Sequence, residues 1–385
     1  MKITDIRTIR LRASLPNEGQ VHSRSGVRAS RSALLVEVHT DEGITGIGSC
    51  SGNGMLIEII VERVLKRLLV GMDPTNIEEV WDKAYFRGGI REFGSRGIGV
   101  VALSGIDIAL WDILGKAKGL PIYKLLGGAK RDKVPVYATA LYPEAVEHVV
   151  QKAVALADRG FRALKIKVGF DLAQDVEIVS AVRERLGKDF TIMTDANQGY
   201  KIDAAVKAAA AFAELDVTWL EEPMFVEDIE AHARLKSQSQ VPIALGENLH
   251  TRFAFEAFMA RNAVDYLQPD VARAGGISEI VKISALAKRY QLPVSLHTWG
   301  DGVALAASLH LSAALENSPV MELDTTCNPL RTEILNQPPE FRDGFMIAPQ
   351  GPGLGVALDP AAIRKYAFSG TEEVALWKEP VSAPV

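Results

Sequence analysis

The chain has 385 residues, of which 48% are apolar and 24% are charged, so it has the composition of an ordinary globular protein and not of a disordered or fibrous one. This length exceeds what one hydrophobic core usually organises, which predicts one large domain and a smaller one. The 43 basic and 48 acidic residues give a net charge of −5, which argues against a nucleic acid partner. Two cysteines cannot form a disulfide framework and the first five residues lack the apolar stretch of a signal peptide, so we expect a cytoplasmic protein.

The first part of the chain predicts an α+β unit spanning residues 1–130. Stretches rich in β-forming residues at 2–11, 32–39 and 44–47 are separated by turns, and a long apolar helix is expected over 100–116. This apolar stretch contains Asp107 and Asp112, which a membrane span would tolerate poorly. We therefore interpret it as a buried core helix and expect no membrane partner.

Strand and helix patterns alternate from residue 131 to residue 347. The expected strands are residues 134–140, 163–168, 190–195, 217–221, 241–246, 264–268, 292–297 and 320–324. Eight strands with intervening helices over this length are typical of a parallel α/β barrel. Residues 348–385 have no place in that pattern, and we expect them to return to the first unit.

Lys165 and Lys167 lie on one face of the second expected strand, because side chains along a strand alternate between its two faces. Helices cover the outside of a barrel, so the apolar face turns outward and both lysines turn into the barrel. Mutual repulsion and partial burial are expected to lower the pKa of one of them toward that of a general base. The alternative is an exposed edge strand with two solvated lysines.

Polar residues recur where the following strands end. They are Asp195, Glu221, Glu247, Asp270, His297 and Glu322. Counted from Lys167 the gaps are 28, 26, 26, 23, 27 and 25 residues, about the length of one strand, one helix and two loops. Each of these residues therefore takes the same position on a successive strand, where barrel enzymes place their chemistry. Taken singly, each would more simply be a helix cap or a solvated loop residue.

The three carboxylates Asp195, Glu221 and Glu247 come from adjacent strands and would repel one another without a cation. Their oxygen atoms favour Mg²⁺, and zinc is disfavoured because nitrogen and sulfur ligands are absent from the trio. His297 and Asp270 end neighbouring strands, which predicts that the carboxylate fixes the imidazole tautomer. The alternative is a core histidine bonded to a backbone carbonyl.

Together these residues resemble the enolase superfamily, and specifically its mandelate racemase subgroup (the mandelate racemase/muconate lactonizing enzyme family). The resemblance rests on these motifs: the helix Ala102-Leu103-Ser104-Gly105-Ile106-Asp107-Ile108-Ala109-Leu110-Trp111-Asp112, Lys165-Ile166-Lys167, Asp195-Ala196-Asn197, Glu221-Glu222-Pro223, Gly246-Glu247-Asn248, and the Asp270 and His297 pair. It implies an α/β fold, a modified TIM barrel (β/α)7β, with an α+β capping domain formed by residues 1–130 and the segment 348–385. A homo-oligomer is implied as well.

The resemblance also implies roles for individual residues. Mg²⁺ would bind Asp195, Glu221 and Glu247. Lys167 would be one acid/base and His297 with Asp270 the other. Lys165 would contact the carboxylate of a small-molecule substrate, and Glu322 would hydrogen-bond a carboxylate oxygen of the intermediate.

The expected reaction begins with abstraction of the α-proton of a carboxylate to give an enediolate. Loss of a β-hydroxyl would then give a 2-keto-3-deoxy acid, and reprotonation on the other face would give the epimer. The candidate substrate-binding residues are Asn197 and, in the expected loop 14–32, His22 and Arg24. Their polarity favours dehydration of an aldonate or aldarate over racemisation or epimerisation of a 2-hydroxy acid.

Two further functions are disfavoured by the sequence. Cycloisomerisation is disfavoured because that branch of the superfamily typically has a lysine where this chain has Asp270. A barrel that binds metal or ligand without turnover would be favoured only if the metal trio or the base pair were broken, and neither is.

Overall fold

The computed structural model describes residues 1–23, 26–87 and 93–370. The first part of the chain forms an antiparallel sheet with the strand order β1-β4-β5. Its strands are β1 (Ile3–Ser14), β4 (Ser30–Thr40) and β5 (Thr45–Cys50), and the hairpin β2 (Val21–Ser23) and β3 (Gly26–Arg28) lies between β1 and β4 in sequence. The helices of this part are η1 (Asn17–Gly19), α1 (Gly54–Ile60), η2 (Val61–Leu65), α2 (Lys66–Leu69), α3 (Ile77–Tyr85) and α4 (Ile98–Lys118). The β-rich stretches expected at 2–11, 32–39 and 44–47 lie in β1, β4 and β5, and the expected loop 14–32 contains the β2–β3 hairpin.

Helix α4 lies directly on strand β5 because glycines remove side chains from their contact. A Cβ atom built at Gly48 would lie 1.9 Å from the carbonyl oxygen of Gly105, and one at Gly105 would lie 2.4 Å from Sγ of Cys50. Such distances are far inside van der Waals contact, so only glycine fits. Within the described part of the chain, α4 is the one helix long and apolar enough to cross a membrane. In the fold, 83% of its most apolar 18-residue stretch is buried. The expectation of a core helix is thus confirmed.

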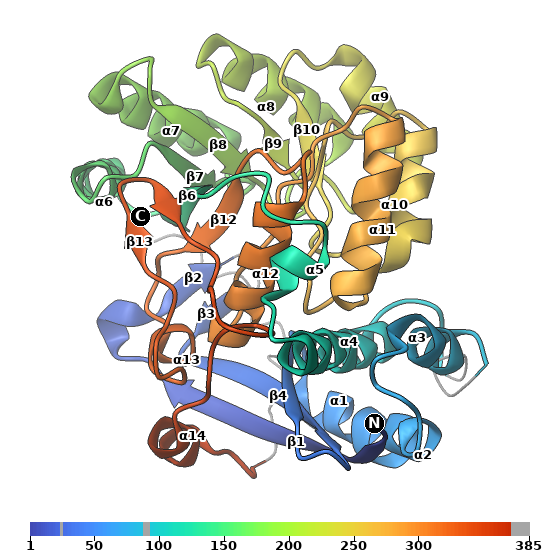
Figure 1. Cartoon of the computed structure of the whole chain (residues 1–385). Helices are drawn as coiled ribbons and strands as arrows, with labels where there is room; N and C mark the ends of the chain where they lie inside the picture. Colours follow the sequence, from blue (N-terminus) through green and yellow to red (C-terminus); the bar gives the residue numbers. More distant parts are fainter. Residues whose placement is uncertain (24–25, 88–92, 371–385) are drawn as a thin grey trace.

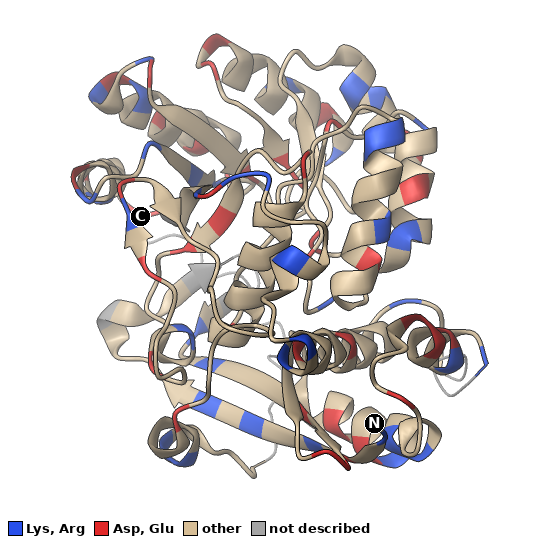
Figure 2. Cartoon of the chain, viewed as in Figure 1, with Lys and Arg blue, Asp and Glu red and all other residues tan. Residues whose placement is uncertain are grey.

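The second part is a parallel barrel whose strands run in the order β11-β10-β9-β8-β7-β6, with β12 paired to β6. The strands are β6 (Val134–Leu141), β7 (Ala163–Lys167), β8 (Thr191–Asp195), β9 (Leu220–Glu221), β10 (Ile243–Leu245), β11 (Tyr266–Leu267) and β12 (Met321–Asp324). The helices are α5 (Ile122–Leu125), α6 (Val146–Asp158), α7 (Leu172–Leu186), α8 (Ile202–Glu214), α9 (Ile229–Gln238), α10 (Thr251–Ala260), α11 (Gly276–Arg289) and α12 (Gly302–Ala314). Figure 1 shows these helices around the strands, and Figure 2 shows acidic and basic residues interspersed along them.

The expected strand at residues 292–297 is wrong as a continuous strand. It joins its neighbours through isolated bridges, Leu267 with Val294 and Asp270 with His297, and it meets β12 through the Glu322 amide, which donates to the Leu296 carbonyl at 3.2 Å. Proline explains the interruption, since Pro269 and Pro293 have no N–H group to donate to a ladder. The barrel still closes at this point, and His297 still lies at the position expected from its spacing.

The chain after β12 runs back toward the first sheet. It forms α13 (Pro329–Thr332), β13 (Phe341–Arg342), β14 (Phe345–Met346) and α14 (Pro360–Tyr366). Ala367 pairs with Leu11 of β1, and the Phe368 amide donates to the Arg10 carbonyl at 2.9 Å. Figure 1 shows α14 at the edge of the first sheet, below α13. Residues 371–385 of the segment expected to return lie outside the described residues.

Asp107 of α4 joins the two parts of the fold and is expected to make stability depend on pH. Its side chain is fully buried, and Oδ2 accepts a hydrogen bond from the Ser278 amide of α11 at 2.9 Å. Burial raises the pKa of Asp107 to about 7. The pKa of an unfolded aspartate is about 3.9, so between about pH 4 and pH 7 the unfolded chain releases a proton that the folded chain keeps. The free energy of unfolding should therefore fall across this interval and level off above it.

Asp107→Asn should flatten this dependence, because asparagine still accepts from Ser278 and carries no charge. The shift of about three pKa units corresponds to at most about 4 kcal/mol between the ends of the interval. Denaturant unfolding at pH 5 and pH 8 measures the difference for wild type and variant. The exposed Asp158, changed to asparagine, serves as the control. Equal slopes for wild type and Asp107→Asn would contradict the prediction.

Candidate active site

Neighbouring barrel strands bring polar side chains to the same edge of the sheet. In the β7–β8 ladder Lys167 is paired with Asp195, and in the β8–β9 ladder Asp195 is paired with Glu221. Glu247 follows β10 after the tight turn at Gly246, where a Cβ atom would lie 2.7 Å from the backbone of Gln268. All of these residues stand at the carboxyl ends of parallel strands, which meet at one mouth of the barrel.

Asp195, Glu221 and Glu247 converge on one point. Each offers a carboxylate oxygen that lies within 4.8 Å of the other two. The side chains of Asp195 and Glu221 are almost fully buried, whereas that of Glu247 is 13% exposed. Three crowded carboxylates favour a divalent cation, and an all-oxygen donor set with one side open suits Mg²⁺.

Both lysines of β7 point into this cluster. Lys165 is fully buried and its Nζ lies 2.7 Å from Glu221 and 3.0 Å from Glu322. Lys167 is 12% exposed, and its Nζ donates to Asp195 at 2.5 Å and to Asn197 at 2.9 Å. The side chains share one face, as the strand pattern predicts.

The expectation of a lowered lysine pKa is wrong for this arrangement. Burial opposes the charge of Lys167 most strongly, but Asp195, Tyr142 and Glu247 together outweigh burial and the repulsion from Lys165, so the pKa of Lys167 is raised. Glu221 and Glu322 raise the pKa of Lys165 against burial in the same way. The carboxylates that face the two ammonium groups thus outweigh the repulsion between them.

His297 lies at the mouth beside Glu247. Its Nδ1 lies 2.7 Å from Oδ2 of Asp270, and its Nε2 lies 3.0 Å from Oε2 of Glu247. Asp270 is itself oriented by the Ala272 amide, which donates to its Oδ1 at 2.8 Å. Burial opposes the charged imidazole, but Glu322, Glu247 and Asp270 together raise the pKa of His297.

Glu322 lies between Lys165 and His297. Its carboxylate accepts hydrogen bonds from the Thr139 hydroxyl at 2.6 Å and the Thr298 amide at 2.9 Å. Burial would raise the pKa of Glu322, but Lys165 and His297 lower it to about 2. The carboxylate is therefore fixed in place and ionised.

Two side chains that the sequence pattern does not single out hold Glu221 in place. Gln268 donates from Nε2 to Oε2 of Glu221 at 2.6 Å, and the Trp219 indole donates to the same oxygen at 3.3 Å. Gln268 stands directly before Pro269 and Asp270 at the end of a strand, so its position alone could have marked it. The neighbouring Glu222 accepts hydrogen bonds from Asn248 at 2.8 Å and Gln198 at 3.3 Å.

The structure does not place the two loop candidates for substrate binding. Arg24 lies outside the described residues, and His22 belongs to β2 with a side chain outside the description. Asn197 does lie in the site, where its amide donates to Oε1 of Glu247 at 3.3 Å and its Oδ1 accepts from Lys167.

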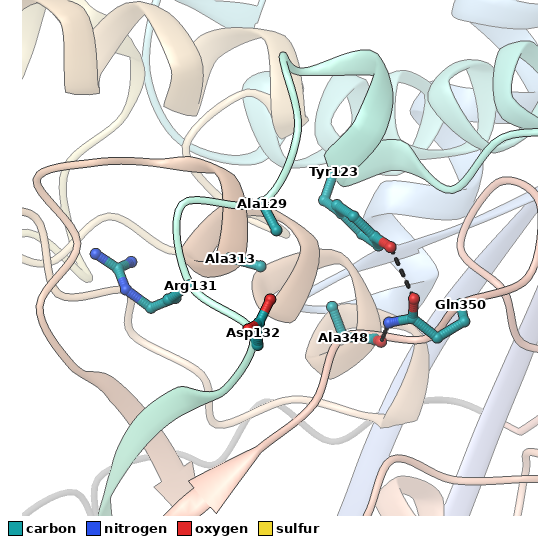
Figure 3. A pocket seen from close by; sticks show the side chains of 7 residues that line it. All are labelled: Tyr123, Ala129, Arg131, Asp132, Ala313, Ala348 and Gln350. Carbon is teal, nitrogen blue, oxygen red and sulfur yellow. Dashed lines mark hydrogen bonds between the residues drawn. The ribbon is translucent and has the colours of Figure 1, made fainter.

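A cavity of about 170 Å³ lies elsewhere, at the end of the barrel where β6 begins. Figure 3 shows its lining, in which the Tyr123 hydroxyl donates to Gln350 at 2.7 Å. The Arg131 guanidinium in its wall is engaged by the backbone carbonyls of Ser312, Leu315 and Glu316 at the end of α12. This cavity therefore lies at the opposite end of the barrel from the carboxylate cluster, and the Arg131 guanidinium in its wall is already hydrogen-bonded.

Comparison with known proteins relates the whole chain to one family. Residues 6–127 match the model of the mandelate racemase / muconate lactonizing enzyme N-terminal domain, and residues 148–362 match that of the enolase C-terminal domain-like family. D-galactarolactone cycloisomerase from Agrobacterium fabrum is 38% identical over 95% of this chain and 99% of its own. Arabinonate dehydratase from Saccharolobus solfataricus is 36% identical over 94% of this chain and 99% of its own.

Comparison with solved structures relates the chain to the same superfamily. A member of the enolase superfamily from Polaromonas sp. JS666 has a TM-score of 0.92 at 36% identity, covering 97% of this chain and all of that one. A racemase from Streptomyces coelicolor with bound magnesium has a TM-score of 0.87 at 32% identity, covering 95% of this chain and all of that one.

The homologues are sugar-acid dehydratases and cycloisomerases, with racemases among the structural neighbours. Because cycloisomerases are among them, the argument from Asp270 against cycloisomerisation does not hold as an exclusion. The modified TIM barrel with its N-terminal capping domain is the fold of the enolase superfamily. The chain is an enzyme of the mandelate racemase/muconate lactonizing enzyme family of that superfamily.

Proposed function

We propose that this enzyme removes the α-proton of a sugar-acid carboxylate and then eliminates the β-hydroxyl, converting an aldonate or aldarate to a 2-keto-3-deoxy acid. The observation that carries the proposal is the placement of two proton carriers, Lys167 and His297, beside one carboxylate cluster. Curated relatives support the substrate class, since they include dehydratases of arabinonate, galactarate and galactonate.

Asp195, Glu221 and Glu247 would hold Mg²⁺. Their oxygen atoms lie close enough to share one ion, and a carboxylate donor set suits this hard cation. When bound there, Mg²⁺ supplies positive charge next to the substrate carboxylate as negative charge accumulates on it. The family supports this assignment, since one structural neighbour contains bound magnesium.

The solvent exposure of the basic and acidic side chains suggests their separate roles in the proposed reaction. Lys167 and His297 are 12% and 11% exposed and can meet a substrate, so one removes the α-proton and the other donates a proton to the departing hydroxyl. The α C–H bond breaks, its electron pair forms the C=C bond of the enol, and the β C–O bond breaks with release of water. Tautomerisation of the enol gives the 2-keto acid. The fully buried Lys165 and the fixed Glu322 would bind the carboxylate of the substrate and of the enediolate.

Cycloisomerisation of a sugar-acid lactone is a second candidate, favoured by the 38% identity to D-galactarolactone cycloisomerase. It would share the proton removal and differ in the leaving group, which would be the ring oxygen of the lactone and not a hydroxyl. Epimerisation would share the same first step and return the proton to the other face.

The test is incubation of the purified protein with Mg²⁺ in D₂O and a panel of aldonates, aldarates, galactarolactone and simple 2-hydroxy acids. Dehydration predicts a keto acid with deuterium at C3, seen by NMR and by semicarbazide absorbance. Deuterium at C2 with inverted configuration and no keto acid would instead indicate epimerisation. Absence of both exchange and product across the panel would overturn the proposal.

A further inference from the structure

Arg31 is a buried arginine that the proposed chemistry does not use. It stands near the start of β4, in the first part of the chain, and only 4% of it is exposed. Its Nη2 donates to Asp324 at 3.3 Å and to the Thr326 hydroxyl, and its Nε donates to the Cys327 carbonyl at 3.2 Å. Its Nη1 is buried and has no hydrogen-bond partner among the described residues.

Arg31 lies at the rim of the mouth, next to the strands that carry the candidate catalytic residues. Asp324 is two residues after Glu322 on β12, and the guanidinium lies 3.9 Å from the ring of Trp299, two residues after His297. Tyr142, which follows β6, is close enough to both Arg31 and Lys167 for their positive charges to act on its hydroxyl. The free guanidinium nitrogen therefore lies on the same side of the barrel as the proton carriers.

The charges around Arg31 do not cancel. Asp324 is shared with Arg331, whose Nη1 donates to it at 2.7 Å, so two guanidinium groups face one carboxylate. Arg28 of the β2–β3 hairpin adds a third positive charge, 5.1 Å from the Trp299 ring. A buried donor without a partner is unfavourable, and an excess of positive charge favours an anion.

We propose that Arg31 is a specificity-determining residue that binds the second carboxylate of a dicarboxylic sugar acid. This inference rests on the proposed function and narrows it from sugar acids in general to aldarates. A carboxylate matches a guanidinium better than a terminal hydroxyl does, because it carries a full charge and accepts charge-assisted hydrogen bonds. Because the Trp299 ring lies 3.9 Å from the guanidinium, binding of this carboxylate requires the indole to move aside.

The experiment compares acids that differ only at the far end of the chain, galactarate with galactonate and glucarate with gluconate. Wild type is expected to favour the diacid in kcat/KM by at least about 10-fold. Arg31→Gln should lower the diacid-to-monoacid ratio by about 10- to 100-fold, the usual effect of a lost hydrogen bond between charged groups. A ratio that stays unchanged in Arg31→Gln, or a wild type that favours the monoacid, would overturn the inference.

Arg331→Gln is the matched control. It also removes a guanidinium from Asp324, but Arg331 already donates to Asp324 and to the Thr326 carbonyl, so Arg331→Gln should lower the diacid-to-monoacid ratio by clearly less than Arg31→Gln does. Arg31→Lys keeps the positive charge and loses the two-pronged guanidinium, so it should give an intermediate diacid-to-monoacid ratio. This variant serves as the test if Arg31→Gln does not fold. Thermal melts with each acid measure binding independently of turnover. If neither acid exchanges its α-proton the proposed function fails, while the ratio of dissociation constants still decides the role of Arg31.

Discussion

Replacing Lys167 by alanine, and separately His297 by asparagine, is expected to lower turnover by about 10³-fold or more in each case. Among the described residues of the cluster, these are the two basic side chains that reach the open side of the barrel mouth, and each is held at hydrogen-bonding distance by a carboxylate, Asp195 or Asp270. Without either one, the α-proton or the departing hydroxyl has no proton carrier within reach. Keto-acid formation and solvent deuterium exchange, followed together by NMR, measure the loss.

Comparing the two readouts also separates the roles of the two residues. The variant that loses both product and exchange has lost the base, and the variant that loses product but retains exchange has lost the acid. Lys152→Ala and His148→Asn, at exposed positions on α6, make the same chemical changes away from the mouth and should leave both readouts unaffected. Full turnover and full exchange in both Lys167→Ala and His297→Asn would refute the proposed mechanism.

The sequence predicts the site well because the site follows from the period of the barrel. One strand, one helix and two loops return the chain to the same edge, so residues about 26 positions apart lie on neighbouring strands, as Asp195 and Glu221 do. The alternation of side chains along β7 likewise places Lys165 and Lys167 on one face. These are local rules that need no knowledge of distant contacts.

The remaining features depend on contacts that no local rule gives. Thr139 donates to Glu322 from a strand 183 residues earlier, and Arg31 reaches Asp324 across 293 residues. The raised pKa of Lys167 likewise depends on Asp195, whose position relative to the ammonium is known only once the strands are paired. The charges and pKa values of the site thus depend on distances between side chains that are known only from the three-dimensional structure.

Glu221→Gln is expected to abolish the stabilisation of the protein by Mg²⁺. Both carboxylate oxygens of Glu221 are held in place, since Oε1 accepts from Lys165 at 2.7 Å and Oε2 from Gln268 at 2.6 Å. Binding of a ligand at 100 times its dissociation constant stabilises a fold by about 2.7 kcal/mol, which a thermal melt resolves easily. The loss of one charged oxygen from three should weaken binding beyond the 10- to 100-fold effect typical of a supporting residue.

Gln268→Leu measures, in the same site, how much the loss of a supporting residue weakens Mg²⁺ binding. It leaves all three carboxylates and removes only the amide that orients Glu221, so the Mg²⁺ concentration at half-maximal stabilisation should rise by about 10- to 100-fold, less than in Glu221→Gln. Glu214→Gln, at an exposed position at the end of α8, removes a carboxylate away from the mouth and should not move the midpoint. If Glu221→Gln responds to Mg²⁺ as wild type does, the ion is bound elsewhere, and the positive charge on which proton removal depends must come from Lys165 and Lys167 alone.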